Sequence, residues 1–256
     1  MKLLLDLGNS RCKFAVVRKG VPDVFDALPY HEHTRLAVIE DVLRQHGKPD
    51  MVVVCSVLDT GLNERLEQLL ASHQIDDYFF LKSTGVDCGI RPGYQNPDEL
   101  GADRLAAMVA ANAKYQGNTC IVDCGTAITV DVLATGGIHH GGVIFPGFMS
   151  MQAALASSTD LEFRLDAASF AIAADSTRDA IYSGCQHAVE GGIEHAVCMM
   201  QDQYGLFDQI ILTGGDAALF APLLTCQTVH EPHLVLDGLK HVSEKVRVGR
   251  KATSES

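Results

Sequence analysis

Two short segments place a carboxylate, a glycine and small polar side chains directly after an apolar run. They contain Asp6, Gly8, Asn9 and Ser10 in one segment and Asp123, Gly125, Thr126 and Thr129 in the other. A carboxylate beside exposed backbone N–H groups suits a magnesium-bound polyphosphate, and a glycine lets the main chain approach the phosphate oxygens and adopt positive φ. A hairpin turn that needs only a glycine is the alternative for either segment alone. Two copies in matching surroundings strengthen the phosphate interpretation. The ammonium of Lys13 could then reach a phosphate oxygen, and a solvated strand residue is the alternative.

The most unusual stretch runs from Tyr94 to Arg104. Gly101 falls inside a helix predicted from Asp98 to Tyr115, where it costs roughly 1 kcal/mol relative to Ala, so a close ligand or a packed neighbour would explain it. Asp103 can accept a proton, and Arg104 can bind a carboxylate or a phosphate. A surface ion pair near a helix start is the alternative.

A third segment, Thr213-Gly214-Gly215-Asp216-Ala217, follows the apolar run Ile210-Ile211-Leu212. We expect a strand, a Gly-Gly turn and a helix that begins near Asp216. Adjacent glycines leave space for a flat ring to lie on the backbone, and a helix N-terminus favours an anion or a polar ligand. A plain strand-to-helix connection is the alternative.

The composition limits the class of protein that can carry these segments. The chain has 256 residues, of which 47% are hydrophobic, and a formal net charge of −12. Apolar residues are too abundant for a disordered chain, and the acidic balance disfavours general nucleic-acid binding while allowing a local pocket for a small anion. No apolar run approaches the length of a membrane span, and Asp6 interrupts the N-terminal run too early for a signal peptide.

The cysteines and histidines show no metal-site spacing. Eight cysteines are scattered without a C-x-x-C pair, so we expect reduced, buried thiols. His31 and His33, and likewise His139 and His140, lack a second ligand pair at a useful spacing. We therefore interpret these histidines as solvated loop residues.

Strand and helix patterns alternate, which predicts a mixed α/β fold. The expected strands cover residues 3–7, 12–17, 51–56 and the two halves of 120–131, and an amphipathic helix is expected at 62–73. Aligning Asp6 with Asp123 also aligns Gly8 with Gly125, which indicates an internal duplication. We expect two similar lobes, residues 1–115 and 116–256, that face each other across a cleft, with the boundary near residues 114–118.

Taken together, these segments resemble the type III pantothenate kinases of the acetate kinase, sugar kinase, Hsp70 and actin superfamily. The resemblance runs from Asp6 to about Gly238 and rests on the order and spacing of several short motifs. These are residues 6–10, 94–104, 123–129, 141–147, 176–184 and 213–217. The resemblance implies an actin-like ATPase fold with two ribonuclease H-like lobes.

The resemblance also implies the reaction and the roles of individual residues. The pantothenate hydroxyl would attack the ATP γ-phosphate, giving 4'-phosphopantothenate in the first step of coenzyme A synthesis, with Asp103 as the general base. Pantothenate would be held by Tyr94, Gly101, Ala102, Asp103, Arg104 and Thr177. ATP, with Mg²⁺ or another divalent cation, would be bound by Asp6, Leu7, Gly8, Asn9, Ser10, Arg11, Cys12, Lys13, Thr126, Gly214 and Gly215. Asp123 would coordinate K⁺ or NH₄⁺, and a cytoplasmic homodimer without nucleic-acid or membrane partners is expected.

Two other functions remain open from the sequence. A kinase for a sugar or another small alcohol would share the two Asp-x-Gly turns but not the stretch from Tyr94 to Arg104. A nucleotide-binding regulator without catalysis is the other alternative, although Asp6, Asp103, Arg104 and Asp123 are all present.

Overall fold

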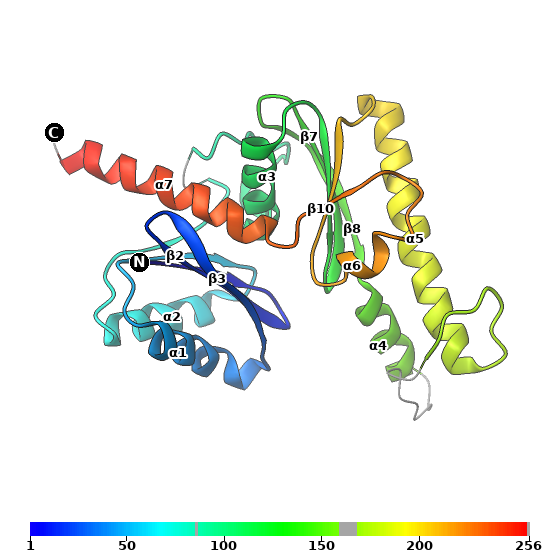
Figure 1. Cartoon of the computed structure of the whole chain (residues 1–256), viewed down its shortest axis with the longest axis horizontal. Helices are drawn as coiled ribbons and strands as arrows, with labels where there is room; N and C mark the ends of the chain where they lie inside the picture. Colours follow the sequence, from blue (N-terminus) through cyan, green and yellow to red (C-terminus); the bar gives the residue numbers. More distant parts are fainter. Residues whose placement is uncertain (85–86, 159–167, 255–256) are drawn as a thin grey trace. The chain divides into compact units, whose positions relative to one another are not determined.

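The computed structural model describes residues 1–84, 87–158 and 168–254, with helices and strands alternating along the chain (Figure 1). The strands are β1 (Lys2–Leu7), β2 (Arg11–Arg18), β3 (Val21–Pro29), β4 (Met51–Ser56), β5 (Tyr78–Phe80), β6 (Thr119–Cys124), β7 (Ala127–Ala134), β8 (Ile138–Pro146), β9 (Gln209–Thr213) and β10 (Val229–His230). The helices are α1 (Arg35–His46), α2 (Thr60–Ser72), α3 (Ala102–Lys114), α4 (Phe148–Ser158), α5 (Thr177–Tyr204), α6 (Ala217–Phe220) and α7 (Leu234–Ser254), with 3₁₀ turns η1 (Glu32–Thr34) and η2 (Pro97–Glu99).

The chain divides into two compact units. Unit 1 contains Met1–Lys114, Gly136–Ile138 and the residues from His233 onward, and unit 2 contains Tyr115–Thr135 and His139–Pro232. The sheet of unit 1 has the strand order β3-β2-β1-β4-β5. In it β1 pairs antiparallel with β2 and parallel with β4, and β4 pairs parallel with β5. The central strands β1 and β4 are buried on both faces, which explains their unbroken apolar sequences.

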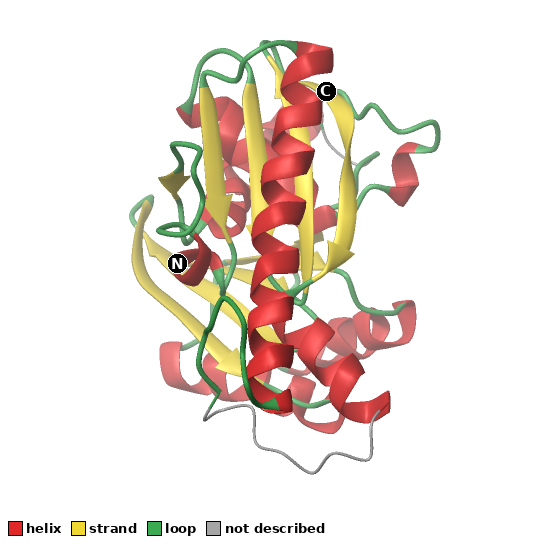
Figure 2. Ribbon diagram, turned by 90° about the vertical axis from the view of Figure 1, so that its right-hand side faces the viewer, coloured by secondary structure: helices red, strands yellow, loops and turns green. Residues whose placement is uncertain are grey.

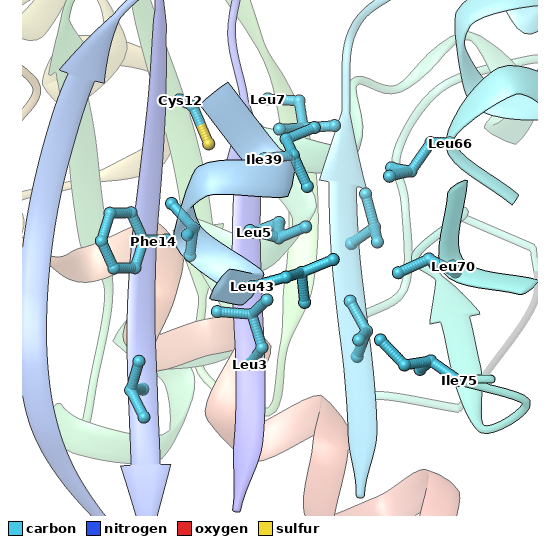
Figure 3. Close-up of a cluster of buried hydrophobic side chains, with 14 of the residues drawn as sticks. Leu3, Leu5, Leu7, Cys12, Phe14, Ile39, Leu43, Leu66, Leu70 and Ile75 are labelled. Carbon is cyan, nitrogen blue, oxygen red and sulfur yellow. The ribbon is translucent and has the colours of Figure 1, made fainter. Parts of the chain in front are cut away.

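Two helices cover one face of the unit 1 sheet. The side chains of β1, β2 and β4 on this face pack against Ile39 and Leu43 of α1 and against Leu66 and Leu70 of α2 (Figure 3). The spacing of four residues in each helix places these side chains on a single stripe. Helix α2 begins where the Asp59 side chain accepts a hydrogen bond from the N–H of Leu62 at 3.0 Å, an N-cap that satisfies one free donor of the first turn.

Helices α3 and α7 pack together and contact the same sheet through β1, β2 and β4. Alanines line the buried side of α3, and a Cβ at Gly238 of α7 would lie only 1.9 Å from the carbonyl oxygen of Ala106. Small residues therefore let the two backbones approach closely. The C-terminal helix thus belongs to unit 1, which differs from the expected division at residue 115, because its apolar face with Leu239 and Val242 is buried there.

Unit 2 repeats the sheet of unit 1. Its strand order from the opposite edge is β8-β7-β6-β9-β10, with β6 antiparallel to β7 and parallel to β9, as β1 is to β2 and β4. The long helix α5 lies across one face of this sheet, where Val189 and Ile193 join the core (Figure 2). The predicted α/β class with two similar ribonuclease H-like lobes is confirmed.

The expected strands correspond to β1, β2, β4, β6, β7 and β9, and the helix at 62–73 corresponds to α2. The helix expected from Asp98 is wrong at its start. Pro97–Glu99 forms a 3₁₀ turn, α3 begins at Ala102, and Gly101 occupies its N-cap position with its carbonyl oxygen bonded to the N–H of Leu105. Glycine is well tolerated at an N-cap, so the expected helix-interior cost does not apply. No helix in the described part of the chain is long and apolar enough to cross a membrane.

Candidate active site

Residues 6–10, called the first phosphate segment from here on, contain the turn between the antiparallel strands β1 and β2. Asp6 lies directly opposite Lys13, and the Lys13 Nζ is 3.7 Å from Asp6 Oδ2. The Asp6 residue is only 6% exposed, whereas Asn9 and Ser10 at the tip are exposed. Burial, and secondly the Asp6 carboxylate, raise the pKa of the Cys12 thiol to about 12. The turn thus has an acid and a base at its root and polar groups at its tip.

The glycines of the two Asp-x-Gly turns do not use the positive φ that a glycine allows. Neither Gly8 nor Gly125 is among the residues with positive φ. A Cβ at Gly8 would lie 3.4 Å from the nearest protein atom, and one at Gly125 3.6 Å, both ordinary contacts. Neither the backbone conformation nor crowding by the protein's own atoms therefore requires glycine at these two positions.

Two residues that the sequence analysis did not single out contact the first turn. Tyr30 and Arg35 form hydrogen bonds to main-chain oxygens of residues 8–10. Both residues are about 20 or more residues from the turn and belong to no short motif. Their contact with the turn becomes visible only in the folded chain, where β3 pairs with β2 and brings the residues after β3 back to the turn.

The segment from Tyr94 to Arg104 folds so that its polar side chains meet. The Arg104 guanidinium donates to the Tyr94 hydroxyl at 2.5 Å and lies 5.3 Å from the centre of its ring. Arg104 is 6% exposed, and the Asp103 Oδ1 accepts from the Arg104 N–H at 2.8 Å in the first turn of α3. A Cβ at Gly101 would lie 2.5 Å from that oxygen. Gly101 therefore leaves the space that the Asp103 carboxylate occupies.

Residues 123–129, the second phosphate segment, contain the turn between β6 and β7. This turn is one residue shorter than the turn between β1 and β2. Asp123 is opposite Thr129, and the Gly125 N–H bonds to the Ala127 oxygen at 3.1 Å. The start of α4 closes over this turn, because a Cβ at Gly147 would lie 2.0 Å from the Gly125 oxygen.

The Gly-Gly segment after β9 packs directly on the second phosphate segment. Gly214 has φ +96°, and a Cβ there would lie 2.4 Å from both Asp123 Oδ1 and the Cys124 oxygen. The Asp216 N–H donates to that same Cys124 oxygen at 2.9 Å. Burial, and then the charges of Asp123 and Asp216, raise the pKa of Cys124 to about 12. Two segments about 90 residues apart in sequence are thus joined in unit 2.

The helix after Gly215 is shorter than the sequence suggested. Helix α6 comprises only Ala217–Phe220, with Asp216 at its N-cap. Four residues align too few peptide dipoles to bind an anion, so the expected contribution of a helix N-terminus is wrong. Gly215 itself is exposed, as a surface for a flat ligand requires.

Thr177 is the first residue of α5 and is exposed. The preceding Ser176 is the N-cap, with its Oγ 3.2 Å from the Asp179 N–H. The main-chain N–H of Ser169, followed by the Ser176 hydroxyl, lowers the pKa of Asp179. A cap fixed on both sides holds the first turn of α5, and with it Thr177, in one orientation.

The expectation for His139 is wrong. It lies in β8 with 1% exposure, and its Nε2 is 2.9 Å from Oδ1 of Asp131, which is 2% exposed. A strand position with a carboxylate partner favours burial over a solvated loop. All eight cysteines are free thiols, but Cys198 is exposed and Cys226 half-buried, so not all are core residues.

The donor groups near the two Asp-x-Gly turns are single carboxylates and main-chain oxygens. Among residues 1–84, 87–158 and 168–254, no cluster of three or more His, Cys, Asp or Glu side chains could hold a metal ion. Single carboxylates are available instead at Asp6 and at Asp123, and both the Cys124 oxygen and the Asp123 carboxylate lie beside Gly214. Such hard oxygen donors fit Mg²⁺ that arrives with a polyphosphate, and they also fit a weakly held monovalent ion.

The two units, each with a five-stranded sheet of the same order, define a two-lobed fold class that includes small-molecule kinases. A solved protein from Porphyromonas gingivalis, described as an N-acetylglucosamine kinase, has a TM-score of 0.56 at 12% identity, covering 95% of this chain and 100% of its own. A Campylobacter jejuni structure, described as a Baf family transcriptional activator, has a TM-score of 0.62 at 23% identity and covers 96% of this chain and 99% of its own. These likenesses establish the fold.

The family is narrower than that class. The family model for type III pantothenate kinase matches residues 2–198. A type III pantothenate kinase of Nitrosococcus oceani is 35% identical over 99% of this chain and 97% of its own length. The chain belongs to the type III pantothenate kinase family, whose members phosphorylate pantothenate with ATP and a divalent cation in coenzyme A biosynthesis.

Proposed function

We propose that Asp103 is the general base in the phosphorylation of pantothenate by this enzyme. The observation that carries the proposal is the fixed position of its carboxylate, which is held by the Arg104 N–H in the space left by Gly101. A carboxylate oriented before the substrate arrives can accept the hydroxyl proton as the phosphoryl group is transferred. In a loose transition state this proton leaves late, so a strongly basic group is not required.

The pantothenate carboxylate binds to Arg104 in this proposal. Its guanidinium is already oriented by Tyr94, and a planar fork of donors matches a carboxylate. Gly101 and Ala102 provide a main-chain surface beside it. The exposed Thr177 supplies a hydroxyl from the start of α5.

The ATP phosphates are assigned to the two turns. Residues 6–13 offer backbone N–H groups and the Lys13 ammonium, and Thr126 offers a hydroxyl and an N–H in unit 2. The adenosine is assigned to the Gly214-Gly215 surface. Asp6 would hold the divalent cation, directly or through water, and this cation supplies neutralisation of phosphate charge when bound.

A monovalent cation, K⁺ or NH₄⁺, is assigned to Asp123. Asp123 lies at the end of β6, directly before the second Asp-x-Gly turn, and hard carboxylate oxygens of this kind suit a weakly held cation. A monovalent charge here would balance the negative charges of Asp123 and of the nucleotide.

We also propose that the enzyme is a cytoplasmic homodimer. Val143 and Ile144 of the edge strand β8 and Met149 and Leu155 of α4 are exposed apolar side chains in unit 2, as a subunit interface requires. The free thiols suit a reducing compartment. Light scattering during size-exclusion chromatography tests the dimer, and a monomer at micromolar concentration would contradict it.

The first experiment measures ADP release from ATP and Mg²⁺ with pantothenate, glucose, glycerol or no acceptor, each in K⁺ and in Na⁺. Turnover is expected with pantothenate and K⁺. Activity with pantothenate that is equal in Na⁺ would refute the cation role of Asp123. Turnover on a sugar instead would refute the substrate.

The second experiment tests the general base with Asp103→Asn. This change should lower kcat by at least about 10²-fold and leave the Kd for ATP nearly unchanged, because it removes the proton acceptor without touching either phosphate turn. Asp41→Asn is the matched control, since Asp41 forms only an exposed ion pair with Arg44 on α1. Unchanged turnover in Asp103→Asn would contradict the assignment.

A further inference from the structure

The three residues at the first phosphate turn have their carbonyl oxygens held by one short segment of unit 1. The Tyr30 hydroxyl donates to the Gly8 oxygen at 2.5 Å, and the Tyr30 N–H donates to the Ser10 oxygen at 3.2 Å. Nη2 of Arg35 donates to the Asn9 oxygen at 3.1 Å. Every carbonyl of the turn is therefore drawn toward the protein.

These three bonds also determine where the N–H groups of the turn point. In a planar trans peptide the C=O and the following N–H point in opposite directions, and the described residues contain no cis peptide bonds. Holding the Gly8 and Asn9 oxygens inward therefore turns the N–H groups of Asn9 and Ser10 outward, toward the exposed side of the turn. Outward N–H groups attract phosphate oxygens, whereas outward carbonyls would repel them.

The position of Arg35 is not explained by packing alone. Its guanidinium lies 5.5 Å from the centre of the Tyr30 ring, and its Nε is buried without a hydrogen-bond partner in the described part of the chain. An unsatisfied buried donor opposes stability. Tyr30 is 5% exposed, and burial raises its pKa, so the hydroxyl keeps the proton that it donates to Gly8.

We propose that Tyr30 and Arg35 are positioning residues of the ATP site, which orient the N–H groups of Asn9 and Ser10 toward the phosphates. Neither residue contacts the reacting atoms, and the Arg35 charge additionally raises the local positive potential. This inference rests on the proposed function, in which residues 6–13 bind ATP.

The test compares KM values for both substrates in Tyr30→Phe and Arg35→Met. Each variant should raise the KM for ATP by about tenfold, roughly the effect of one lost hydrogen bond, and leave the KM for pantothenate within about twofold. Arg44→Met on the same helix is the control, because Arg44 forms exposed ion pairs with Glu40 and Asp41. It should change neither KM.

Circular dichroism melts establish which variants are folded. If Tyr30→Phe is unfolded, the KM values of Arg35→Met alone test the inference. An unchanged KM for ATP, or an equal rise in both KM values, would overturn the inference. Lys13→Met separates it from the proposed function. If Lys13→Met raises the KM for ATP and the two positioning variants do not, the inference alone fails. If Lys13→Met also leaves it unchanged, the assignment of the turn to ATP fails and the inference falls with it.

Discussion

Replacing Gly101 by alanine adds one methyl group at the point where the Asp103 carboxylate lies. The new Cβ would be 2.5 Å from Oδ1 of Asp103, and an ordinary contact requires about 3.4 Å, so the oxygen must move by roughly 0.9 Å. Its hydrogen bond from the Arg104 N–H, now 2.8 Å, would be strained or broken. Displacement of a catalytic group by about 1 Å costs about 10²-fold in rate. We therefore expect kcat to fall about 10²-fold, equivalent to about 2.7 kcal/mol.

The same change should affect stability only slightly. Gly101 is an N-cap without positive φ, where alanine in place of glycine costs about 1 kcal/mol or less. The clashing atom is the end of a side chain and can rotate away. Loss of turnover without loss of folding is therefore the expected signature.

The assay is pantothenate-dependent ADP release, with thermal unfolding measured on the same preparation. Gly191→Ala is the matched control, because a Cβ at this position of α5 meets no atom within 4 Å. The control should retain full turnover and gain about 0.5–1 kcal/mol of stability. Full turnover in Gly101→Ala would show that the position of the Asp103 carboxylate does not limit catalysis.

Three further outcomes are expected. Gly214→Ala, at φ +96° and with its Cβ 2.4 Å from Asp123 Oδ1, should lower the free energy of unfolding by about 2–4 kcal/mol in urea titrations, and a loss below about 1 kcal/mol would contradict the close packing. His139→Ala removes a donor to the buried Asp131 and should cost about 3 kcal/mol by the same measurement, whereas a neutral effect would show that the pair is dispensable. Burial raises the pKa of the Cys12 thiol from 9.0 to about 12, so its contribution to stability is complete below pH 9 and is lost as pH rises toward 12. Cys12→Ala should therefore reduce the fall of unfolding free energy between pH 9 and 12 by about 1.4 kcal/mol per pH unit, and an unchanged slope would contradict the raised pKa.

The sequence predicts the local parts of this fold well. Apolar runs with two flanking turns locate β1, β2 and β6, and the spacing of Leu62, Leu66 and Leu70 locates α2, because these signals reside within a few neighbouring residues. The amphipathic pattern of α7 gives no indication of its partner. Its docking on α3 depends on complementary small residues such as Gly238, which only the folded chain brings together.

The candidate site shows the same division. Asp103 and Arg104 stand out as adjacent charged residues, but their arrangement depends on Gly101 as an N-cap rather than as a helix-interior residue. Tyr30 and Arg35 act through main-chain oxygens of residues distant in sequence, and a backbone oxygen carries no side-chain signal. Hydrogen bonds to main-chain oxygens therefore leave no pattern of residue types in the sequence.

The membership of α7 in unit 1 has a consequence for synthesis on the ribosome. The residues from Met1 to Lys114 emerge first, yet the helix that covers the alanine face of α3 begins only at Leu234. At about 5–20 residues per second, on the order of ten seconds passes between the two. During that time the nascent unit 1 exposes an apolar helix face, which favours aggregation unless a holding chaperone covers it. A chain divided on either side of Tyr115 therefore gives no fragment that contains all of unit 1.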